Sequence, residues 1–253
     1  MFIKNKALVL KNQASEGKKT YIVAYAAGIG KITYLVKGID RNEAKLKSAL
    51  LPFSYSEIIA IVSQGKLVIT RATLIKNLYP QKSFEAQTIA FYVTDLADKL
   101  IEEGIWDEQI SSLLLTMLNL LKGSSNKRLM LLVLSYFPLK LIKYLGYFPE
   151  LSSCVNCAQK LSPQHNFLSY KKGGLLCPKC KRVDQQSLMI NQQELNFIKQ
   201  IAQHNFNFVR KTTLNDKRLK ELANFANLYA SYITGDIPKS YFFYKNSFSL
   251  SLS

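Results

Sequence analysis

Short runs rich in β-branched and aromatic residues, separated by polar or glycine-containing turns, fill the first eighty residues of this 253-residue chain. Such runs predict β-strands, and the predicted strands are Ile3–Leu10, Thr20–Tyr25, Lys31–Val36, Pro52–Val62 and Lys66–Leu74. We expect the basic stretch from Lys37 to Ser48 to form a loop. Five short strands in about eighty residues indicate a small closed barrel, and the OB-fold has this strand count.

The hydrophobic period changes to that of an α-helix at about Phe84. Asn191 is a suitable N-cap for one of the later helices, and Gly123 and Gly146 are suitable ends for two others. Pro138 is expected to kink or restart the helix that contains it. The predicted helices are 84–100, 110–121, 127–145, one that opens at 191–194, and 214–233.

These elements predict an α+β multidomain protein, in which a five-stranded OB-fold β-barrel precedes an all-α domain with an inserted four-cysteine zinc ribbon. No internal repeat is evident. The expected boundaries are 1–80 for the OB-fold, 81–151 and 184–240 for the two parts of the helical domain, 152–183 for the ribbon, and 241–253 for a flexible tail.

The ribbon is predicted from the four cysteines of the chain, which form the pairs Cys154/Cys157 and Cys177/Cys180. Two Cys-x-x-Cys turns at this separation are typical of a zinc ribbon, in which four thiolates surround Zn²⁺ tetrahedrally. The alternatives are two disulfides, which need an oxidising compartment, or thiols that are merely close together. His165 could also act as a ligand, although four cysteines make it unnecessary. One structural, non-catalytic Zn²⁺ is expected, because four sulfurs leave no open coordination position.

Charge is distributed unevenly along the chain. The 34 Lys and Arg outnumber the 17 Asp and Glu, which gives a formal net charge of +17. Residues 1–80 carry 13 basic and 4 acidic side chains, residues 81–150 carry 7 and 8, and residues 151–253 carry 14 and 5. Two basic segments that flank a nearly neutral one favour a polyanionic partner, and nucleic acid is the common one. A uniform compositional bias, which is the alternative, would have made the middle segment basic as well.

Candidate DNA-binding residues lie mainly around the third predicted strand and the loop after it. Basic side chains would neutralise phosphates and a tyrosine would stack on bases. The set is Lys31, Lys37, Arg41, Lys45, Lys47, Arg71 and Tyr34, with Tyr21 and Tyr25 as further aromatic candidates. The alternative for each tyrosine is a place in the barrel core.

Three other groups of basic residues are less clearly assigned. A secondary DNA-binding set, which could equally be a solvated turn, surrounds the cysteine pairs and comprises Lys171, Lys172, Lys179, Lys181 and Arg182. The candidate residues for docking a protein partner are basic side chains on the predicted third helix: Lys127, Arg128, Lys140 and Lys143. A final group is interpreted as solvated helix surface and comprises Lys211, Lys217, Arg218 and Lys220.

No catalytic site is evident from the sequence. The segment Gly28–Lys31 partly matches a phosphate-binding loop, but Tyr25 and Ile32 occupy positions that need Gly and Ser or Thr. No apolar run is long enough to span a bilayer, and Met1–Leu10 lacks the pattern of a signal peptide. A non-enzymatic, cytoplasmic protein without a membrane anchor is therefore expected.

Several short motifs follow one another from end to end of the chain: Lys6–Leu10, Gly30–Ile32, Lys37–Arg41, Leu51–Phe53, Leu145–Leu151, Gly173–Cys177, and Gly235 with Pro238–Ser240. Their order and content resemble the bacterial RecO family of recombination mediators. The resemblance implies an OB-fold, a helical domain and a zinc ribbon set into it. Lysine replaces much of the arginine of the family, and Ser135–Pro138 stand where the family often carries arginines.

The resemblance also implies a function in the nucleoid-associated cytoplasm. Such a protein would bind single- and double-stranded DNA, anneal complementary strands, and help RecA to displace single-strand-binding protein. It would work together with RecR and contact the acidic C-terminal tail of single-strand-binding protein.

Two other functions are compatible with the residues. A zinc-ribbon, OB-fold protein could bind RNA or associate with the ribosome, and a preference for structured RNA would indicate this. The helical domain could instead be a scaffold that docks proteins while the basic charge is incidental. In that case only changes on the helical surface would impair function.

Overall fold

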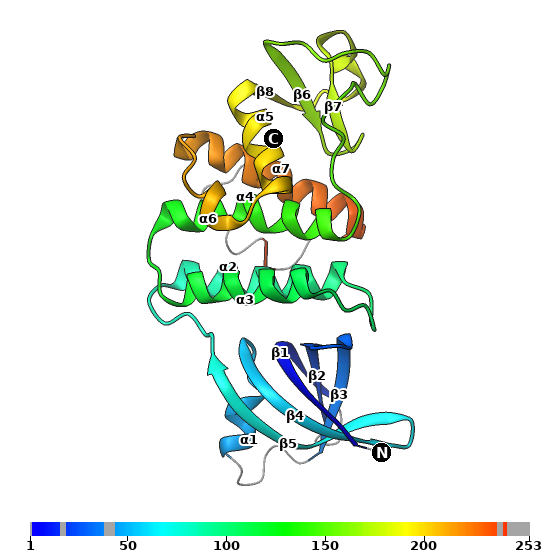
Figure 1. Cartoon of the computed structure of the whole chain (residues 1–253), viewed down its shortest axis with the longest axis vertical. Helices are drawn as coiled ribbons and strands as arrows, with labels where there is room; N and C mark the ends of the chain where they lie inside the picture. The colour runs from blue at the N-terminus through cyan, green and yellow to red at the C-terminus, as the bar shows by residue number, and fades with distance from the viewer. Residues whose placement is uncertain (1, 16–18, 38–43, 237–239, 242–253) are drawn as a thin grey trace. The chain divides into compact units, whose positions relative to one another are not determined.

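The computed structural model describes residues 2–15, 19–37, 44–236 and 240–241. The chain forms two compact units, Met1–Ser125 and Asn126–Ser253 (Figure 1). No helix among the described residues combines the length and the apolar character that crossing a membrane requires.

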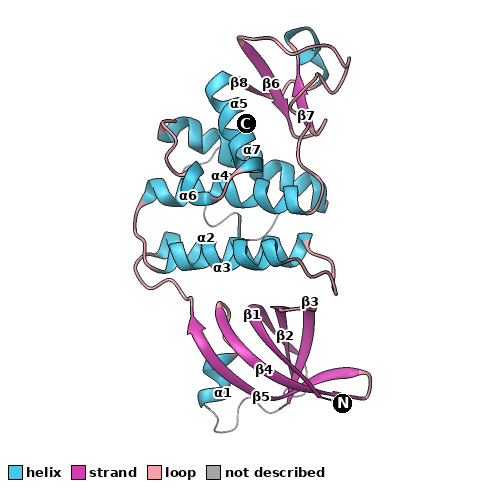
Figure 2. Cartoon of the chain, viewed as in Figure 1, coloured by secondary structure: helices cyan, strands magenta, loops and turns pink. Residues whose placement is uncertain are grey.

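The first unit begins with a closed five-stranded barrel (Figure 2). Its strands follow one another around the barrel in the order β1-β2-β3-β5-β4, and β1 pairs with β4 to close it. All neighbouring strands are antiparallel except β3 and β5. The bounds are β1 Phe2–Ser15, β2 Lys19–Ala26, β3 Gly30–Lys37, β4 Ser54–Ser63 and β5 Lys66–Asn77. The predicted barrel, and with it the predicted α+β class, is confirmed.

Alternation along the strands builds the barrel core. Every second residue of a strand points inward, and the buried core residues follow this period: Ala7 and Val9, Ile22 and Ala24, Tyr34 and Val36, and Ile58 and Ala60. Many of the inward residues are alanine, which suits the narrow interior of a five-stranded barrel. Register shifts in β1 and between β4 and β5 supply the bends that close the sheet.

A short helix, α1 (Ala44–Ala49), lies in the segment that we predicted to be a loop. That prediction was wrong for this part of the segment. Leu46 packs against the barrel core and Leu50, just after the helix, is buried in it. Burial of these side chains stabilises a helix that is too short to be stable by itself.

Two helices, α2 (Phe84–Leu100) and α3 (Glu108–Lys122), complete the first unit. The Ser83 hydroxyl accepts a hydrogen bond from the N–H of Ala86, and the Asp107 carboxylate accepts from the first turn of α3, so both helices have side-chain N-caps. Gly123 ends α3 as predicted.

The connection between α2 and α3 packs against the barrel through glycine. Gly30, at the start of β3, has φ +93°, and a Cβ built on it would lie 2.1 Å from the carbonyl oxygen of Ile105. The Tyr25 ring stacks on Trp106 with ring centroids 5.3 Å apart, and its hydroxyl accepts from the N–H of Asp107 at 2.9 Å. Only glycine permits this close approach of backbone to backbone.

Alanine at Gly30 is therefore expected to destabilise the first unit strongly, since it adds a backbone clash to the cost of a left-handed residue. Gly28 is a matched control, because it has φ +74° but no neighbouring atom within 4 Å of the place that a Cβ would take. Gly28→Ala should lower the free energy of unfolding by about 1–2 kcal/mol, which is the cost of the left-handed backbone conformation alone. Urea denaturation of both variants tests this, and equal losses would show that the contact with Ile105 is unimportant.

The second unit packs helices together with a small ribbon. Helix α4 packs mainly against α7. The bounds are α4 Lys127–Tyr144, β6 His165–Ser169, β7 Gly174–Leu176, the 3₁₀ helix η1 Pro178–Val183, β8 Leu188–Asn191, α5 Gln192–Gln203, α6 Phe206–Val209 and α7 Asp216–Thr234. Helix α4 continues through Pro138, so the predicted restart does not occur. Gly146 follows its end with φ +86°, as predicted.

A buried ion pair connects α5 with α7. The Glu194 side chain has no exposed surface and forms a capping box with Asn191 at the start of α5, which confirms the predicted N-cap. Its second carboxylate oxygen accepts from Arg218 Nε, and Arg218 also bonds Glu221 and the carbonyl oxygen of Met189. Arg218 was interpreted as solvated surface, and that interpretation was wrong.

Candidate metal centre and nucleic-acid interface

The four cysteines come together at one end of the ribbon. Cys154 and Cys157 lie in the turn before β6, Cys177 follows β7, and Cys180 lies in η1. Their sulfur atoms all lie within 4.8 Å of one another, and the sulfurs of Cys157 and Cys177 are 3.8 Å apart. All four are free thiols, so the alternative of two disulfides is not what the structure holds.

One backbone amide and one side-chain amide orient and polarise these sulfurs. The N–H of Cys177 donates to the sulfur of Cys154 at 3.3 Å, and the Asn156 amide donates to Cys180 at 3.4 Å. Burial opposes ionisation of Cys154, but hydrogen bonds from backbone amides, that of Cys177 foremost, outweigh it and lower the pKa of this thiol to about 6. Asn156 would lower the pKa of Cys180, but hydrogen bonds with the other thiols raise it to about 12.

This arrangement fits a tetrahedral metal ion. Zn²⁺ bonded to four thiolates at about 2.3 Å would hold the sulfurs about 3.8 Å apart, which is the separation of Cys157 and Cys177. Four thiols this close cannot all ionise without a cation between them, because like charges at short range oppose one another. The donor set of four sulfurs therefore suits a structural metal.

Two of the motifs noted in the sequence pack together to hold the ribbon. The N–H of Glu150 donates to Gly173, and the N–H of Leu175 donates back to Glu150, at 2.9 and 3.0 Å. A Cβ on Gly174 would lie 2.6 Å from the Glu150 carbonyl oxygen, so glycine is required there. From α7, the Tyr229 hydroxyl donates to the carbonyl oxygen of Tyr147 at 2.7 Å. These contacts hold the segments 145–151 and 173–177 against each other.

Two of the predicted DNA-binding residues are used inside the first unit. Lys31 Nζ donates to the Asp98 carbonyl oxygen at 2.6 Å and lies 3.8 Å from its carboxylate, with 13% of the side chain exposed. Tyr34 is 1% exposed in the barrel core, and burial raises its pKa to about 12. Lys31 is therefore not free to contact phosphate and Tyr34 cannot stack on a base, so both assignments were wrong.

The other members of the set are placed differently from one another. Lys47, at the end of α1, and Arg71, on β5, are both exposed. Arg41 lies outside the described residues, and the side chains of Lys37 and Lys45 do so too. For these five residues DNA contact stays a prediction.

Tyr21, one of the further aromatic candidates, pairs on the barrel surface with Lys66, a residue that we did not predict. Lys66 Nζ donates to the Tyr21 hydroxyl at 3.2 Å and lies 5.5 Å from the centre of its ring. Lys66 follows the turn between β4 and β5, and Tyr21 lies on β2; OB-folds bind oligonucleotides with the β2–β3 face and the loops beside it. The sequence could have indicated Lys66, because it directly follows Ser63–Gly65, the hairpin turn that forms the loop between β4 and β5.

The secondary basic set around the ribbon is exposed. Lys171, Lys172, Lys179, Lys181 and Arg182 all have exposed side chains.

Aromatic rings accompany two members of that set. Lys171 Nζ lies 5.7 Å from the centre of the Tyr170 ring, and Tyr170 packs edge-on against Tyr232 of α7. Lys181 Nζ lies 4.9 Å from the centre of the Phe167 ring. Phe167 is buried in the ribbon core, so of these two rings the half-buried Tyr170 is the one that a base could reach beside the exposed cations.

The residues proposed to dock a protein partner do not form one surface. Lys127 and Lys143 are exposed. Arg128 instead bonds Asp216 and the carbonyl oxygens of Thr212 and Leu214. Lys140 is 5% exposed.

Lys140, like Arg128, is hydrogen-bonded to backbone carbonyl oxygens of the second unit. Its ammonium donates to the carbonyl oxygens of Ile201, Ala202 and His204 at the end of α5, at 2.9–3.2 Å. Lys140 therefore cannot dock a partner, and it caps a helix end as cations favourably do.

The stability contributed by Lys140 should depend on pH. Burial, with the charge of Lys143, lowers the pKa of Lys140 from 10.5 to about 8. Between these values the unfolded chain binds more protons than the folded one, so the free energy of unfolding rises as pH increases through this window. Denaturation at pH 7.5 and pH 10 should show the difference between wild type and Lys140→Met growing in favour of the wild type. A difference that does not change with pH would contradict this assignment.

Two family models match the chain. The model described as Recombination protein O N terminal matches residues 1–78, and the one described as Recombination protein O C terminal matches residues 81–241. The chain belongs to the RecO family. The resemblance that the ordered motifs indicated is thereby confirmed.

Relatives of this RecO-family chain align over most of their own length. A protein named DNA repair protein RecO from Alkaliphilus metalliredigens is 30% identical over 192 residues, which are 76% of this chain and 77% of the relative. Its namesake from Dehalococcoides mccartyi strain BAV1 is 26% identical over 242 residues, covering 94% and 93%. The one from Syntrophomonas wolfei is 25% identical over 227 residues, covering 89% and 88%.

Proposed function

We propose that this RecO-family protein acts in DNA repair as a recombination mediator and not as an enzyme. It binds single- and double-stranded DNA, anneals complementary strands, and assists RecA loading on DNA coated with single-strand-binding protein, together with RecR. The names of the relatives support a role in DNA repair. The observation that carries the DNA-binding proposal is the surface pair of Lys66 and Tyr21 on the oligonucleotide-binding face of an OB-fold barrel.

The mechanism rests on neutralising charge. Residues 1–80 and 151–253 each carry nine more basic than acidic side chains (13 against 4, and 14 against 5). Each phosphate contact releases counterions, which favours binding at low salt without reading sequence. Two strands held on one basic protein repel each other less and meet at a higher local concentration, so complementary strands anneal faster.

Zinc is proposed as the resident metal of the ribbon. Cys154, Cys157, Cys177 and Cys180 would hold it, and its chemistry would be to fix the two turns that carry them. The basic ribbon residues would then be presented on a rigid surface as an extension of the DNA path.

Protein partners are proposed from family membership. The exposed lysines Lys127 and Lys143 of α4 remain available for the acidic tail of single-strand-binding protein. RecR would bind elsewhere on the protein, and we assign no residues to it.

Fluorescence anisotropy of a labelled, unstructured single strand over a salt series tests the DNA proposal. The Lys66→Ala and Tyr21→Leu variants should each bind more weakly, and Lys66→Ala should also reduce the salt slope by about one. Lys122→Ala is a matched control, because this lysine at the end of α3 donates to the Asn77 carbonyl oxygen. Unchanged binding in both barrel variants would remove the site from this face. Stronger binding to structured RNA would favour the RNA-binding alternative.

A further inference from the structure

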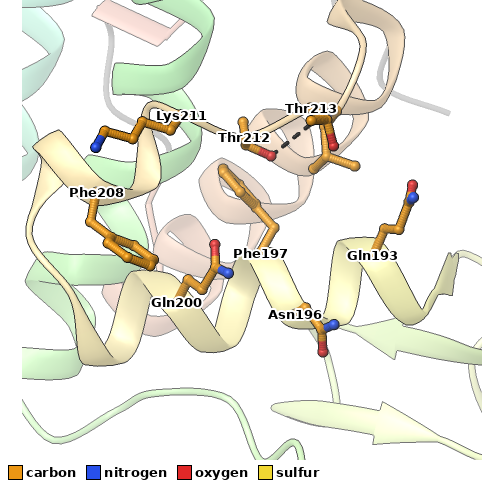
Figure 3. Close-up of a pocket in the computed structure, with 9 residues that line it drawn as sticks. Gln193, Asn196, Phe197, Gln200, Phe208, Lys211, Thr212 and Thr213 are labelled. Atoms are coloured by element: carbon orange, nitrogen blue, oxygen red, sulfur yellow. Dashed lines mark hydrogen bonds between the residues drawn. The ribbon is translucent and has the colours of Figure 1, made fainter.

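A hollow of about 320 Å³ opens beside α5, in the second unit (Figure 3). Its floor is apolar, formed by the buried side chains of Phe197 and Leu214. One wall is a row of side-chain amides on α5, at the helical spacing that places Gln193, Asn196 and Gln200 on a single face. Its volume lies at the lower end of the range for small-molecule sites, about 300–1,000 Å³.

The polar groups around the hollow are neutral apart from one cation. None of the described residues that line it is acidic, and Lys211 stands at its rim. Within the described part of the chain, Gln193 and Gln200 make no side-chain hydrogen bond, so their amides can both donate and accept. A cationic ligand would find no opposite charge among these lining residues, whereas a neutral planar group with donors and acceptors on its edges would find matching amides.

An aromatic platform borders the amides. Phe208 lines the hollow, keeps 47% of its surface exposed, and stacks on His204 with ring centroids 4.0 Å apart. Figure 3 shows the Phe208 ring beside Gln200, with Lys211 on the adjoining turn. The stack on His204 holds the ring in place before any ligand arrives.

The wall opposite the row of amides is also ordered before a ligand binds. The turn that carries Thr212 and Leu214 is held by Arg128, whose guanidinium donates to the carbonyl oxygens of both at 3.0 and 2.8 Å. The hydroxyl of Thr212 accepts from the N–H of Leu214 at 3.3 Å (Figure 3). A site whose walls are already ordered loses little entropy when a ligand binds.

We propose that this hollow takes one unstacked base of a single-stranded nucleic acid. The base stacks on Phe208, its edge bonds the amide of Gln200, and a neighbouring phosphate meets Lys211. Single strands are recognised through aromatic stacking and hydrogen bonds to base edges in this way. The inference rests on the proposed function, and it adds a base-binding site in the second unit to the phosphate-binding barrel of the first.

An acidic peptide is the competing occupant. It would require several cations, and among the lining residues only Lys211 supplies one. The amide row and the exposed ring match a base more closely.

The test separates base binding from phosphate binding. Anisotropy is measured with an ordinary single strand and with an abasic strand of equal length and charge, for the wild type, Phe208→Leu and Phe208→Trp. Leucine keeps an apolar side chain but cannot stack, so it should weaken binding to the ordinary strand by roughly tenfold and leave the abasic strand unaffected. Tryptophan should retain the wild-type preference. Phe84→Leu, at an exposed phenylalanine of α2, is the control, and thermal melting verifies folding.

Each other outcome overturns the inference. Equal losses for the two strands, or no loss, in Phe208→Leu would show that the ring does not hold a base. Weaker binding of an acidic peptide by Phe208→Leu, with DNA binding unchanged, would identify a peptide site. If the wild type binds the ordinary strand and only the base preference fails, the proposed function stands without this site. If the wild type binds neither strand, both are wrong.

Discussion

Serine in place of Cys177 is expected to eliminate zinc binding and to unfold the ribbon while the helices of the second unit remain folded. The ribbon has too small an apolar core to be stable without metal. Its buried cluster consists of Phe167, Leu176 and two of the cysteines, with Val155, Leu161 and Cys180 packed beside them. Structural zinc contributes about 10–16 kcal/mol to folding in small metal-dependent domains, which far exceeds what this core supplies.

Metal content and hydrogen exchange measure the effect. The wild type should contain one zinc per chain, and Cys177→Ser none, with loss of amide protection in β6 and β7. His165→Ala is the control, because His165 lies on β6 with an exposed side chain and should leave zinc content unchanged. Zinc-free wild type with a fully protected ribbon would show that the fold does not depend on metal.

Methionine in place of Arg218 is expected to lower the free energy of unfolding of the second unit by about 3–5 kcal/mol, because it leaves the Glu194 carboxylate buried and unpaired. Glu194 has no exposed surface, and Arg218 is the cation in contact with it among the described residues. The change also removes the bond from Arg218 to the Met189 carbonyl oxygen, which joins β8 to α7.

A double variant distinguishes the effect of the unpaired charge from the effect of lost packing. Glu194→Gln combined with Arg218→Met removes both charges and should recover part of the loss in urea denaturation. Lys217→Met, next to Arg218 and exposed, is the control and should cost less than about 0.5 kcal/mol. A loss of that small size for Arg218→Met would mean that Glu194 is not held as a buried anion.

The sequence was sufficient for features that depend on local order. The two Cys-x-x-Cys pairs predicted the cysteine cluster, because their spacing and turns are fixed by neighbours in the chain. Strand punctuation predicted the barrel. The helix ends at Gly123 and Gly146 and the start at Asn191 also followed from residues within a few positions.

Features that depend on distant partners could not be predicted in the same way. Lys31 was assigned to DNA because nothing local shows that Asp98 would neutralise it, and Lys140 was assigned to a partner because nothing local shows the carbonyl oxygens at the end of α5. Tyr34 differs, because Ile32, Tyr34 and Val36 alternate on one face of β3 and that alternation could have indicated an inward side chain.

Annealing of two complementary labelled single strands, followed by fluorescence after mixing, measures directly whether charge neutralisation by this protein brings strands together. We expect the protein to accelerate annealing at low salt, and the acceleration to fall as salt increases, because phosphate neutralisation drives it. If the folded, zinc-bound protein gives no acceleration at any salt concentration, it is not an annealing protein.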